Sequence, residues 1–232
     1  ELAQSILFTH LIPKDELFYC DFIYLLLKDI IIGIENGFQE FEKKHLLKTK
    51  MILSGNKVLI TGGNKGIGLA LAKKFLKLNN QVIITGRNVE DLQAVKQCFP
   101  EIHIINCDLA TKEGLEKLTQ YIKKEHQDLN VLINNACIQY NHTFAEDPEA
   151  IKKIEFETQI NFLAPVKLTA LLLPILEQNN NAAIVNVSSV LALVPKVVAP
   201  IYCANKAGLH IFTKTLRQQL KKVKVFEILP PL

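Results

Sequence analysis

The sequence lacks the features that mark several classes of protein. Its five cysteines include no C-x-x-C pair, and their odd number argues for a reduced interior rather than a framework of disulfides. No metal-ligand spacing occurs among the cysteines and the six histidines, so we predict no metal site. The net charge of +4 is too small to indicate binding to nucleic acid.

The sequence also lacks a long uninterrupted apolar run. Its most apolar stretch, ELFYCDFIYLLLKDIIIGI, is broken by Asp21, Lys28 and Asp29, whereas a spanning helix needs about 20 mostly uncharged residues. Neither a basic leader nor a small-residue cleavage site occurs near the N-terminus. We therefore expect no membrane insertion, no signal peptide and a cytoplasmic location.

Residues 1–50 differ in pattern from the rest of the chain. They are rich in apolar residues at helical spacing, with Ser5, Asp15 and Gly37 as punctuation between helices. The chain begins at Glu1, and Met51, its only methionine, stands where the pattern changes. We expect a helical extension without catalytic groups, either native to the protein or joined from another reading frame.

From Met51 onward, short β-branched runs alternate with helical runs. The predicted strands are 57–61, 81–85, 102–106, 130–133, 183–187 and 224–229, and the predicted helices are 66–78, 89–98, 112–125, 148–178 and 200–221. Mostly apolar strands separated by helices are typical of a parallel sheet covered on both faces. We predict an α/β fold with a doubly wound, Rossmann-like sheet in the order 3-2-1-4-5-6. Thr111 and Asp147 are predicted helix caps, the latter followed by Pro148.

A glycine-rich stretch, ITGGNKGIG, lies between the first predicted strand and the first predicted helix. Gly62, Gly66 and Gly68 form a G-x-x-x-G-x-G pattern there. A bare backbone lets a pyrophosphate approach amide groups at a helix N-terminus, where the helix dipole favours anions. The pattern therefore predicts a dinucleotide site, although a flexible turn alone would also use glycine.

Four polar residues further along the chain form a possible catalytic set. Tyr202 and Lys206 are four residues apart on a predicted helix and share one face. An adjacent ammonium lowers the pKa of a tyrosine, so Tyr202 is a candidate general acid or base. Ser189 follows a predicted strand and can bind the same oxygen, and Asn161 is a poor helix former within a predicted helix. Taken singly, each has a structural explanation as a cap, core or surface residue.

Together these motifs resemble the short-chain dehydrogenase/reductase family. TGGNKGIG is similar to its cofactor motif and NNA at 134–136 to its strand-stabilising motif. Asn161, NVSS ending at Ser189, and YCANK at 202–206 are similar to its catalytic set, with Tyr202 thirteen residues after Ser189 and forty-one after Asn161. Runs such as VLINNACIQ resemble a bacterial subgroup associated with lipoteichoic-acid D-alanylation operons.

The resemblance implies roles for particular residues. Ser189, Tyr202 and Lys206 would be catalytic, and Asn161 would hold a water that links Lys206 to solvent. The implied cofactor contacts are Gly62, Asn64, Lys65, Gly66, Ile67, Gly68, Arg87, Asp108, Leu109, Asn135, Ala136, Tyr202 and Lys206. Asp108 would contact the adenine.

The choice of cofactor can be argued from charge. Arg87 follows the second predicted strand, where NAD-selective enzymes tend to carry an acid, and Lys65 precedes the second motif glycine. Two cations suit the 2′-phosphate of NADP and leave an unmodified ribose without a carboxylate acceptor. We therefore favour NADP over NAD.

Two residues depart from the family pattern. Cys137 stands where the family usually has glycine, and Pro231 where it usually has the glycine of PG. The family also continues beyond the position of Leu232 through a nicotinamide loop, a capping helix and a seventh strand. We expect residues 51–232 to form a dehydrogenase domain that is incomplete at its C-terminus.

The main hypothesis is an NADP-dependent oxidoreductase acting on a small carbonyl or alcohol by a Ser-Tyr-Lys mechanism. The alternatives are a non-catalytic NADP-binding regulator or scaffold, and an inactive fragment or fusion product. The apolar stretch VLALVPKVVAP at 190–200 suits either a substrate wall or a subunit interface. We expect a homodimer or homotetramer formed through the helices 148–178 and 200–221.

Overall fold

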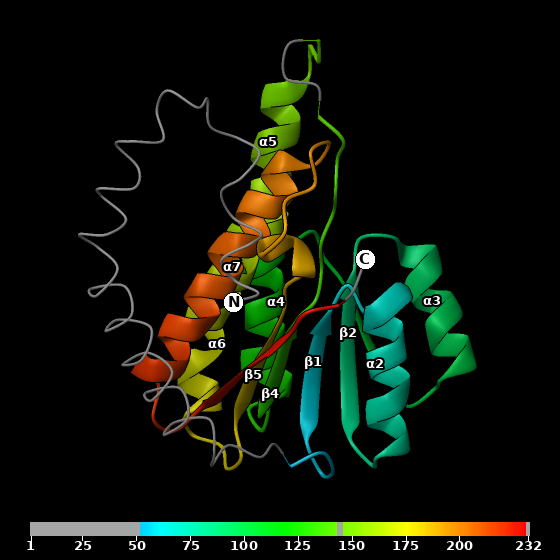
Figure 1. Ribbon diagram of the computed structural model, residues 1–232. Coiled ribbons are helices and arrows are strands. Elements are labelled where there is room, and N and C mark those ends of the chain that lie inside the picture. Colours follow the sequence, from blue (N-terminus) through cyan, green and yellow to red (C-terminus); the bar gives the residue numbers. More distant parts are fainter. Residues whose placement is uncertain (1–51, 143–145, 231–232) are drawn as a thin grey trace, which may run out of the picture. The chain divides into compact units, whose positions relative to one another are not determined.

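The computed structural model describes residues 52–142 and 146–230, which belong to the unit Met51–Leu232. The expected helical extension at 1–50 lies outside the described residues, as does Pro231. Within them, six strands form one parallel sheet in the order β3-β2-β1-β4-β5-β6, which confirms the predicted order (Figure 1). The strands are β1 (Lys57–Thr61), β2 (Gln81–Gly86), β3 (His103–Asn106), β4 (Val131–Asn134), β5 (Ala183–Val187) and β6 (Lys224–Ile228).

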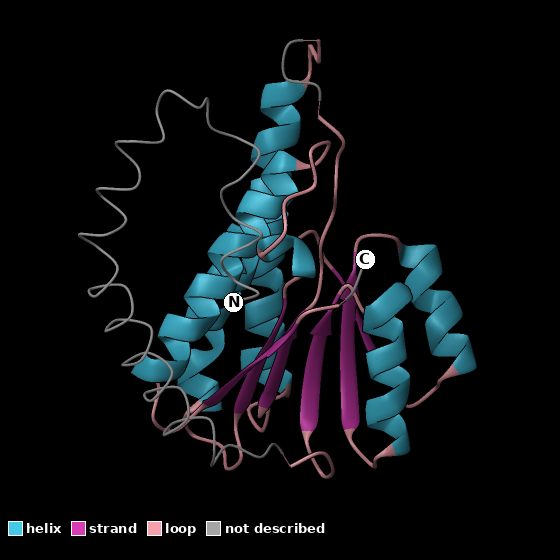
Figure 2. Ribbon diagram, viewed as in Figure 1, coloured by secondary structure: helices cyan, strands magenta, loops and turns pink. Residues whose placement is uncertain are grey.

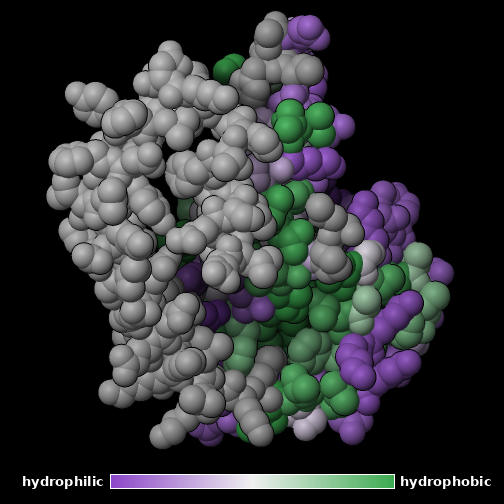
Figure 3. Space-filling view, viewed as in Figure 1, coloured by the Kyte–Doolittle hydropathy of each residue, from purple (hydrophilic) through white to green (hydrophobic). Residues whose placement is uncertain are grey.

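Helices cover the two faces of the sheet (Figure 2). They are α2 (Gly66–Lys77), α3 (Val89–Cys98), α4 (Lys112–Glu125), α5 (Ala150–Thr158), α6 (Ala164–Leu176) and α7 (Pro200–Gln219). Successive side chains of a strand point to opposite faces. Accordingly Leu59 packs in a cluster with α4, α6 and α7, whereas its neighbours Val58 and Ile60 pack in a second cluster with α2 and α3. Figure 3 shows hydrophobic side chains gathered over the sheet and hydrophilic ones along the outer sides of α2 and α3.

The strand order creates the place where a ligand can bind. β1 pairs with β2 on one side and with β4 on the other, so the connections leaving β1 and β4 run in opposite directions. At such a switch point the loops separate at the carboxyl ends of the strands and leave a crevice. The loops that follow β1 and β4 carry the glycine-rich and NNA motifs.

Several predicted boundaries are confirmed to the residue. They are the strands 57–61 and 183–187 and the helices 89–98 and 112–125, and most other ends shift by one or two residues. Thr111 caps α4 as predicted, since its hydroxyl accepts a hydrogen bond of 3.0 Å from the Gly114 N–H. These are the segments whose apolar period and capping residue agree.

The helix predicted over 148–178 is wrong as a single regular helix. α5 begins at Ala150, a π-helical turn occupies Gln159–Leu163, and α6 follows. Asp147 is no helix cap, because its carboxylate accepts the Glu149 N–H at 3.0 Å and binds the Lys153 Nζ at 2.8 Å. It closes a turn that precedes the helix.

The helical rod Ala150–Leu176 is long and apolar enough to cross a membrane by length and composition. Half of its most apolar window is buried inside the structure. Leu168 and Leu172 are within the core cluster on the α4 side of the sheet. The same composition is therefore explained by packing as a core helix.

A buried histidine, His126, lies at the C-terminal end of α4. His126 is buried, and neither ring nitrogen has a hydrogen-bond partner within the described residues. Its ring packs against those of His103 and Tyr121, with 5.3 Å between centroids in both pairs. Burial, followed by the nearby positive charge of Lys57, lowers the pKa of His126 below its ordinary value.

This histidine should make the fold acid-sensitive. Below an ordinary histidine pKa of about 6.5 the unfolded chain takes up a proton that folded His126 resists, so stability falls as pH falls through that range. We expect the midpoint of thermal unfolding to drop between pH 7.5 and pH 5.5, and to drop less in His126→Phe. Calorimetry at both pH values measures this, and an equal drop in the two proteins would refute it.

Candidate active site

The glycine-rich loop joins β1 to α2 and bends through left-handed backbone. Gly62 has a φ of +63° and Gly66 a φ of +54°, a region that side chains other than glycine rarely adopt. Lys65 provides no side-chain cap to α2, and no acid lies in the first turn of this helix. The N–H groups at this helix end are therefore available to an anion.

A set of hydrogen bonds holds this loop against the end of β4. The Asn135 amide donates to the carbonyls of Thr61 and Gly62, at 2.9 and 3.1 Å. The Thr61 hydroxyl in turn accepts the N–H groups of Asn135 and Ala136, at 2.9 and 3.0 Å. A Cβ at Gly68 would collide with the Gly62 carbonyl oxygen and the Asn135 amide. Only glycine fits at this position.

A cavity of about 870 Å³ opens beside this loop. The predicted site residues that line it are Gly62, Asn64, Lys65, Gly66, Ile67, Arg87, Leu109, Asn135, Ala136, Ser189 and Tyr202. Gly68, Asp108, Asn161 and Lys206 are not among its lining residues. The cavity thus connects the glycine-rich loop at one end with Ser189 and Tyr202 at the other.

Asp108 has a local structural contact instead. Its carboxylate accepts the Ala110 N–H at 2.9 Å and so closes the turn after β3. The residues on either side of it, Cys107 and Leu109, do line the cavity. Asp108 is itself not among the lining residues, and its contact with the adenine stays a prediction.

The charged end of the cavity holds the two predicted cations and one acid that the sequence analysis missed. Lys65, Arg87 and Asp91 all line it. The Asp91 carboxylate accepts a hydrogen bond of 3.2 Å from the Asn64 amide, and the Arg87 guanidinium lies 5.3 Å from the centre of the Phe156 ring. Asp91 lies in the first turn of α3, where an acid is common, so its residue type alone does not indicate a site. The signal available in the sequence is its position four residues after Arg87.

Ser189, Tyr202 and Lys206 come together at the other end. Tyr202 and Lys206 lie one turn apart on α7, and the Lys206 Nζ is 5.6 Å from the centre of the Tyr202 ring. Lys206 is almost fully buried, and its Nζ donates a hydrogen bond of 2.8 Å to the Val187 carbonyl. Ser189 follows β5 and caps the short 3-10 turn Val190–Ala192 by accepting the Leu191 N–H at 3.1 Å.

Burial dominates the electrostatics of Tyr202 in the protein without a ligand. Burial, followed by the nearby Cys137 thiol, raises the pKa of Tyr202 to about 12, while hydrogen bonding to Ser189 acts in the opposite direction. Burial also lowers the pKa of Lys206. In the protein without a ligand Tyr202 therefore keeps its proton at neutral pH. The expected lowering of this pKa by Lys206, with a bound nicotinamide nearby, stays a prediction.

Asn161 lies in the π-helical turn between α5 and α6. Its side chain forms two hydrogen bonds with the backbone of Ile138: the carbonyl oxygen accepts the Ile138 N–H at 2.9 Å, and the amide donates to the Ile138 carbonyl at 2.7 Å. Pro165 lacks the N–H that would pair with the Asn161 main-chain carbonyl in an α-helix. The π turn and this proline leave that carbonyl without its ordinary helical donor, which is typical of functional positions in helices.

The described residues can be examined for the kind of ligand that their chemistry fits. No group of three or more His, Cys, Asp or Glu residues within 52–142 and 146–230 is placed to hold a metal ion. By contrast, the Gly68 contact, the open helix end and the cations Lys65 and Arg87 fit an extended ligand with phosphate groups.

Residues 56–232 match the model of the family described as short chain dehydrogenase. The chain belongs to the short-chain dehydrogenase family. It is 47% identical over 184 residues to an uncharacterized oxidoreductase, DltE, of Bacillus subtilis, a match that covers 78% of this chain and 73% of that protein. It is 30% identical to a fatty acyl-CoA reductase of Acinetobacter baylyi, covering 75% of this chain and 60% of the reductase.

Solved structures of the same family agree in fold. The chain is similar to L-sorbose reductase from Gluconobacter frateurii, solved with NADPH and L-sorbose, with a TM-score of 0.71, 30% identity, and coverage of 79% of this chain and 72% of that one. A metagenomic short-chain oxidoreductase solved with NADP gives a TM-score of 0.69 at 26% identity, covering 76% and 82% of the two chains. Both matches therefore support the fold described above.

The two glycines of the loop should differ in how they tolerate a methyl group. Gly66→Ala meets no atom within 4 Å but keeps a left-handed φ, so we expect it to destabilise the protein by about 1–2 kcal/mol. Gly68→Ala must push apart the Gly62 carbonyl and the Asn135 amide, and we expect a clearly larger loss. Urea unfolding compares the two variants, and equal losses would contradict the proposed close packing.

Proposed function

We propose that this protein is an NADP-dependent oxidoreductase that interconverts a carbonyl and an alcohol by a Ser-Tyr-Lys mechanism. The observation that carries the proposal is the single cavity that joins the glycine-rich loop to Ser189 and Tyr202. Membership of the short-chain dehydrogenase family supports the reaction class. A place in the cytoplasm is part of the proposal, as for other enzymes that draw on a soluble nucleotide.

The cofactor would lie along the cavity from the glycine-rich loop toward Tyr202. Gly62 and Gly66 would let its phosphates approach the N-terminus of α2. Lys65 and Arg87 would bind the 2′-phosphate, and Asp91 would limit the net charge at this end. The bound nicotinamide would supply or accept the hydride.

Proton transfer would be the task of the side chains at the other end. Tyr202 would donate its phenolic proton to the substrate oxygen during reduction, and Ser189 would hold that oxygen by a hydrogen bond. A phenol with a pKa raised to about 12 keeps this proton at neutral pH. Lys206 would stabilise the phenolate that forms, because its buried Nζ lies 5.6 Å from the centre of the Tyr202 ring.

Replacement of the proton on Tyr202 would need a path to solvent. The Asn161 main-chain carbonyl, left without its ordinary helical donor before Pro165, can hold a water for this purpose. Its side chain is already used by Ile138, so the relay would run through the main chain. In this proposal the side chain of Asn161 positions Ile138, and its main-chain carbonyl binds the water.

An oligomer would fit the surface of the helices that the sequence analysis selected. Ile151, Leu171 and Ile211 are exposed apolar residues on α5, α6 and α7. We propose that these helices form a homodimer or homotetramer interface. Light scattering of the wild type and of Ile211→Glu measures the mass, and a monomeric wild type would refute this part of the proposal.

The general-acid role of Tyr202 can be tested by removing its hydroxyl. We expect Tyr202→Phe to lower turnover of a carbonyl substrate by about 10²–10⁴ while NADPH binding persists, because only the transferable proton is lost. Steady-state kinetics and fluorescence titration measure the two effects. Tyr121→Phe, an exposed tyrosine on α4, is the matched control. Near-normal turnover in Tyr202→Phe would rule out the assigned role.

The cofactor preference can be tested at Arg87. We expect the wild type to bind NADPH more tightly than NADH, and Arg87→Ala to reduce this preference about tenfold or more, because a charge-assisted hydrogen bond to the 2′-phosphate is lost. Binding of NADH should change little. Lys112→Ala removes an exposed cation elsewhere and serves as control. An unchanged preference in Arg87→Ala would argue against the assignment.

A further inference from the structure

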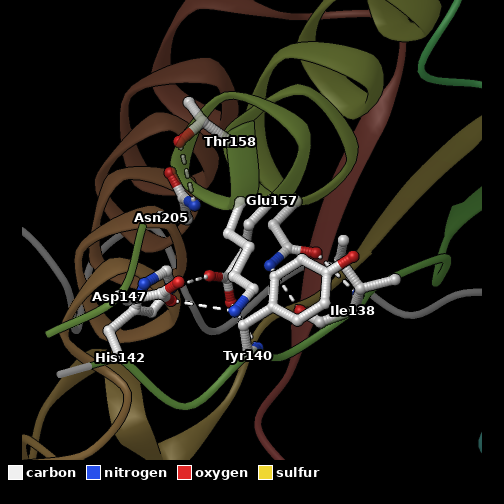
Figure 4. A network of polar contacts seen from close by, with 9 residues as sticks. Ile138, Tyr140, His142, Asp147, Glu157, Thr158 and Asn205 are labelled. Carbon is white, nitrogen blue, oxygen red and sulfur yellow. Dashed lines mark hydrogen bonds and ion pairs between the residues drawn. The ribbon is translucent and has the colours of Figure 1, made fainter. Parts of the chain in front are cut away.

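A carboxylate and an imidazole are buried together beside the site just described. Of the nine residues of α5, Glu157 alone is buried. Its side chain and that of His142 are both fully enclosed, and the His142 Nε2 lies 3.0 Å from the Glu157 Oε2 (Figure 4). None of the tasks assigned above to Ser189, Tyr202, Lys206 and Asn161 uses either residue.

Stability alone is a poor explanation for this pair. Removing ionisable groups from water is costly, and apolar residues of similar size often serve a core equally well or better. The rest of α5 is exposed or half-buried, so no larger polar cluster on this helix requires a buried carboxylate. Nearby Asp147 is already bound to Lys153 at 2.8 Å. The pair is better explained by what it holds in place.

Two contacts connect the pair to the segments beside the cavity, and a third, made by Asn161, lies next to them. The Glu157 Oε1 accepts the main-chain N–H of Tyr140 at 3.4 Å, and the main-chain N–H of His142 donates to the Val198 carbonyl at 2.9 Å. Asn161, one helical turn after Glu157, clamps Ile138. Glu157 and Asn161 thus hold the segment 138–142 at several points along its length. The hydrogen bond from His142 to Val198 joins this segment to the one that precedes α7.

Both segments belong to the proposed site. Ile138 and Gln139 line the cavity, and Val198 lies four residues before Tyr202. We propose that Glu157 and His142 are positioning residues that fix the loop after β4 and the start of α7 relative to one another. Their catalytic effect depends on the proposed function, whereas their effect on the geometry of the two segments does not.

The test replaces the pair without leaving a buried charge unpaired. In Glu157→Leu/His142→Leu both polar groups are lost together and the core keeps apolar side chains of comparable size. Glu157→Gln keeps the hydrogen-bonding shape without the charge, and Glu155→Leu, an exposed residue of the same helix, is the control. Each variant is made in the full chain, and circular dichroism checks that it is folded.

Hydrogen exchange measures how firmly the backbone of the two segments is held. We expect the double variant to lose protection in peptides covering 137–142 and 196–203 but not in those covering β1 and α2. Glu157→Gln should retain most of the protection and Glu155→Leu all of it. Unchanged protection of both segments in the double variant would overturn the proposal. If the double leucine variant does not fold, the milder variant Glu157→Gln/His142→Gln replaces it. This variant must lose protection in the same two segments relative to the wild type, and unchanged protection would overturn the proposal.

Kinetics then separates this proposal from the function itself. We expect the double variant to lose about 10- to 100-fold in kcat, as for a small misplacement of reacting groups, with little change in the dissociation constant for NADPH. The single variant Glu157→Gln should retain most of the wild-type kcat. A wild type that turns over no carbonyl would refute the proposed function, while the exchange data would still decide the positioning role. Lost protection with unchanged kcat would overturn the catalytic part.

Discussion

The hydrogen bonds between Thr61 and Asn135 are the contacts on which the rest of the site depends. β1 and β4 are neighbours in the sheet, yet the loops that leave them must separate to open a crevice. The Thr61 hydroxyl and the Asn135 amide join the two strand ends at the point where the sheet hydrogen bonds stop. Without them the glycine-rich loop and the wall of the cavity would have no fixed separation.

Much of this architecture can be read from the sequence because several local signals agree. Strands such as 57–61 contain a continuous apolar run, here residues 58–60, and the cap at Thr111 coincides with the start of a helical period. The break inside 148–178 could not be read in this way, since a π turn has no periodic signature and depends on Pro165 and on the clamp between Asn161 and Ile138. Asp147 misled because a turn and a helix cap use the same residue types.

The composition of the site was more predictable than its electrostatics. Spacing places Tyr202 and Lys206 on one face of a helix, and the structure agrees. The direction of the Tyr202 pKa depends on how deeply the phenol is buried and on Cys137, which is sixty-five residues away in sequence. The pairing of Glu157 with His142 is similarly invisible, because burial of a helix residue is a property of the tertiary fold.

Burial of Tyr202 and Lys206 has opposite consequences for the two groups but a common one for the proposed reaction. It raises the pKa of the phenol and lowers that of the ammonium, because burial disfavours the charged form of either group. A phenol that keeps its proton is ready to donate it to a carbonyl, whereas oxidation of an alcohol requires the phenolate first. In the proposed reaction, reduction can therefore use the phenol as it stands, whereas oxidation would first need more alkaline conditions or added positive charge beside Tyr202.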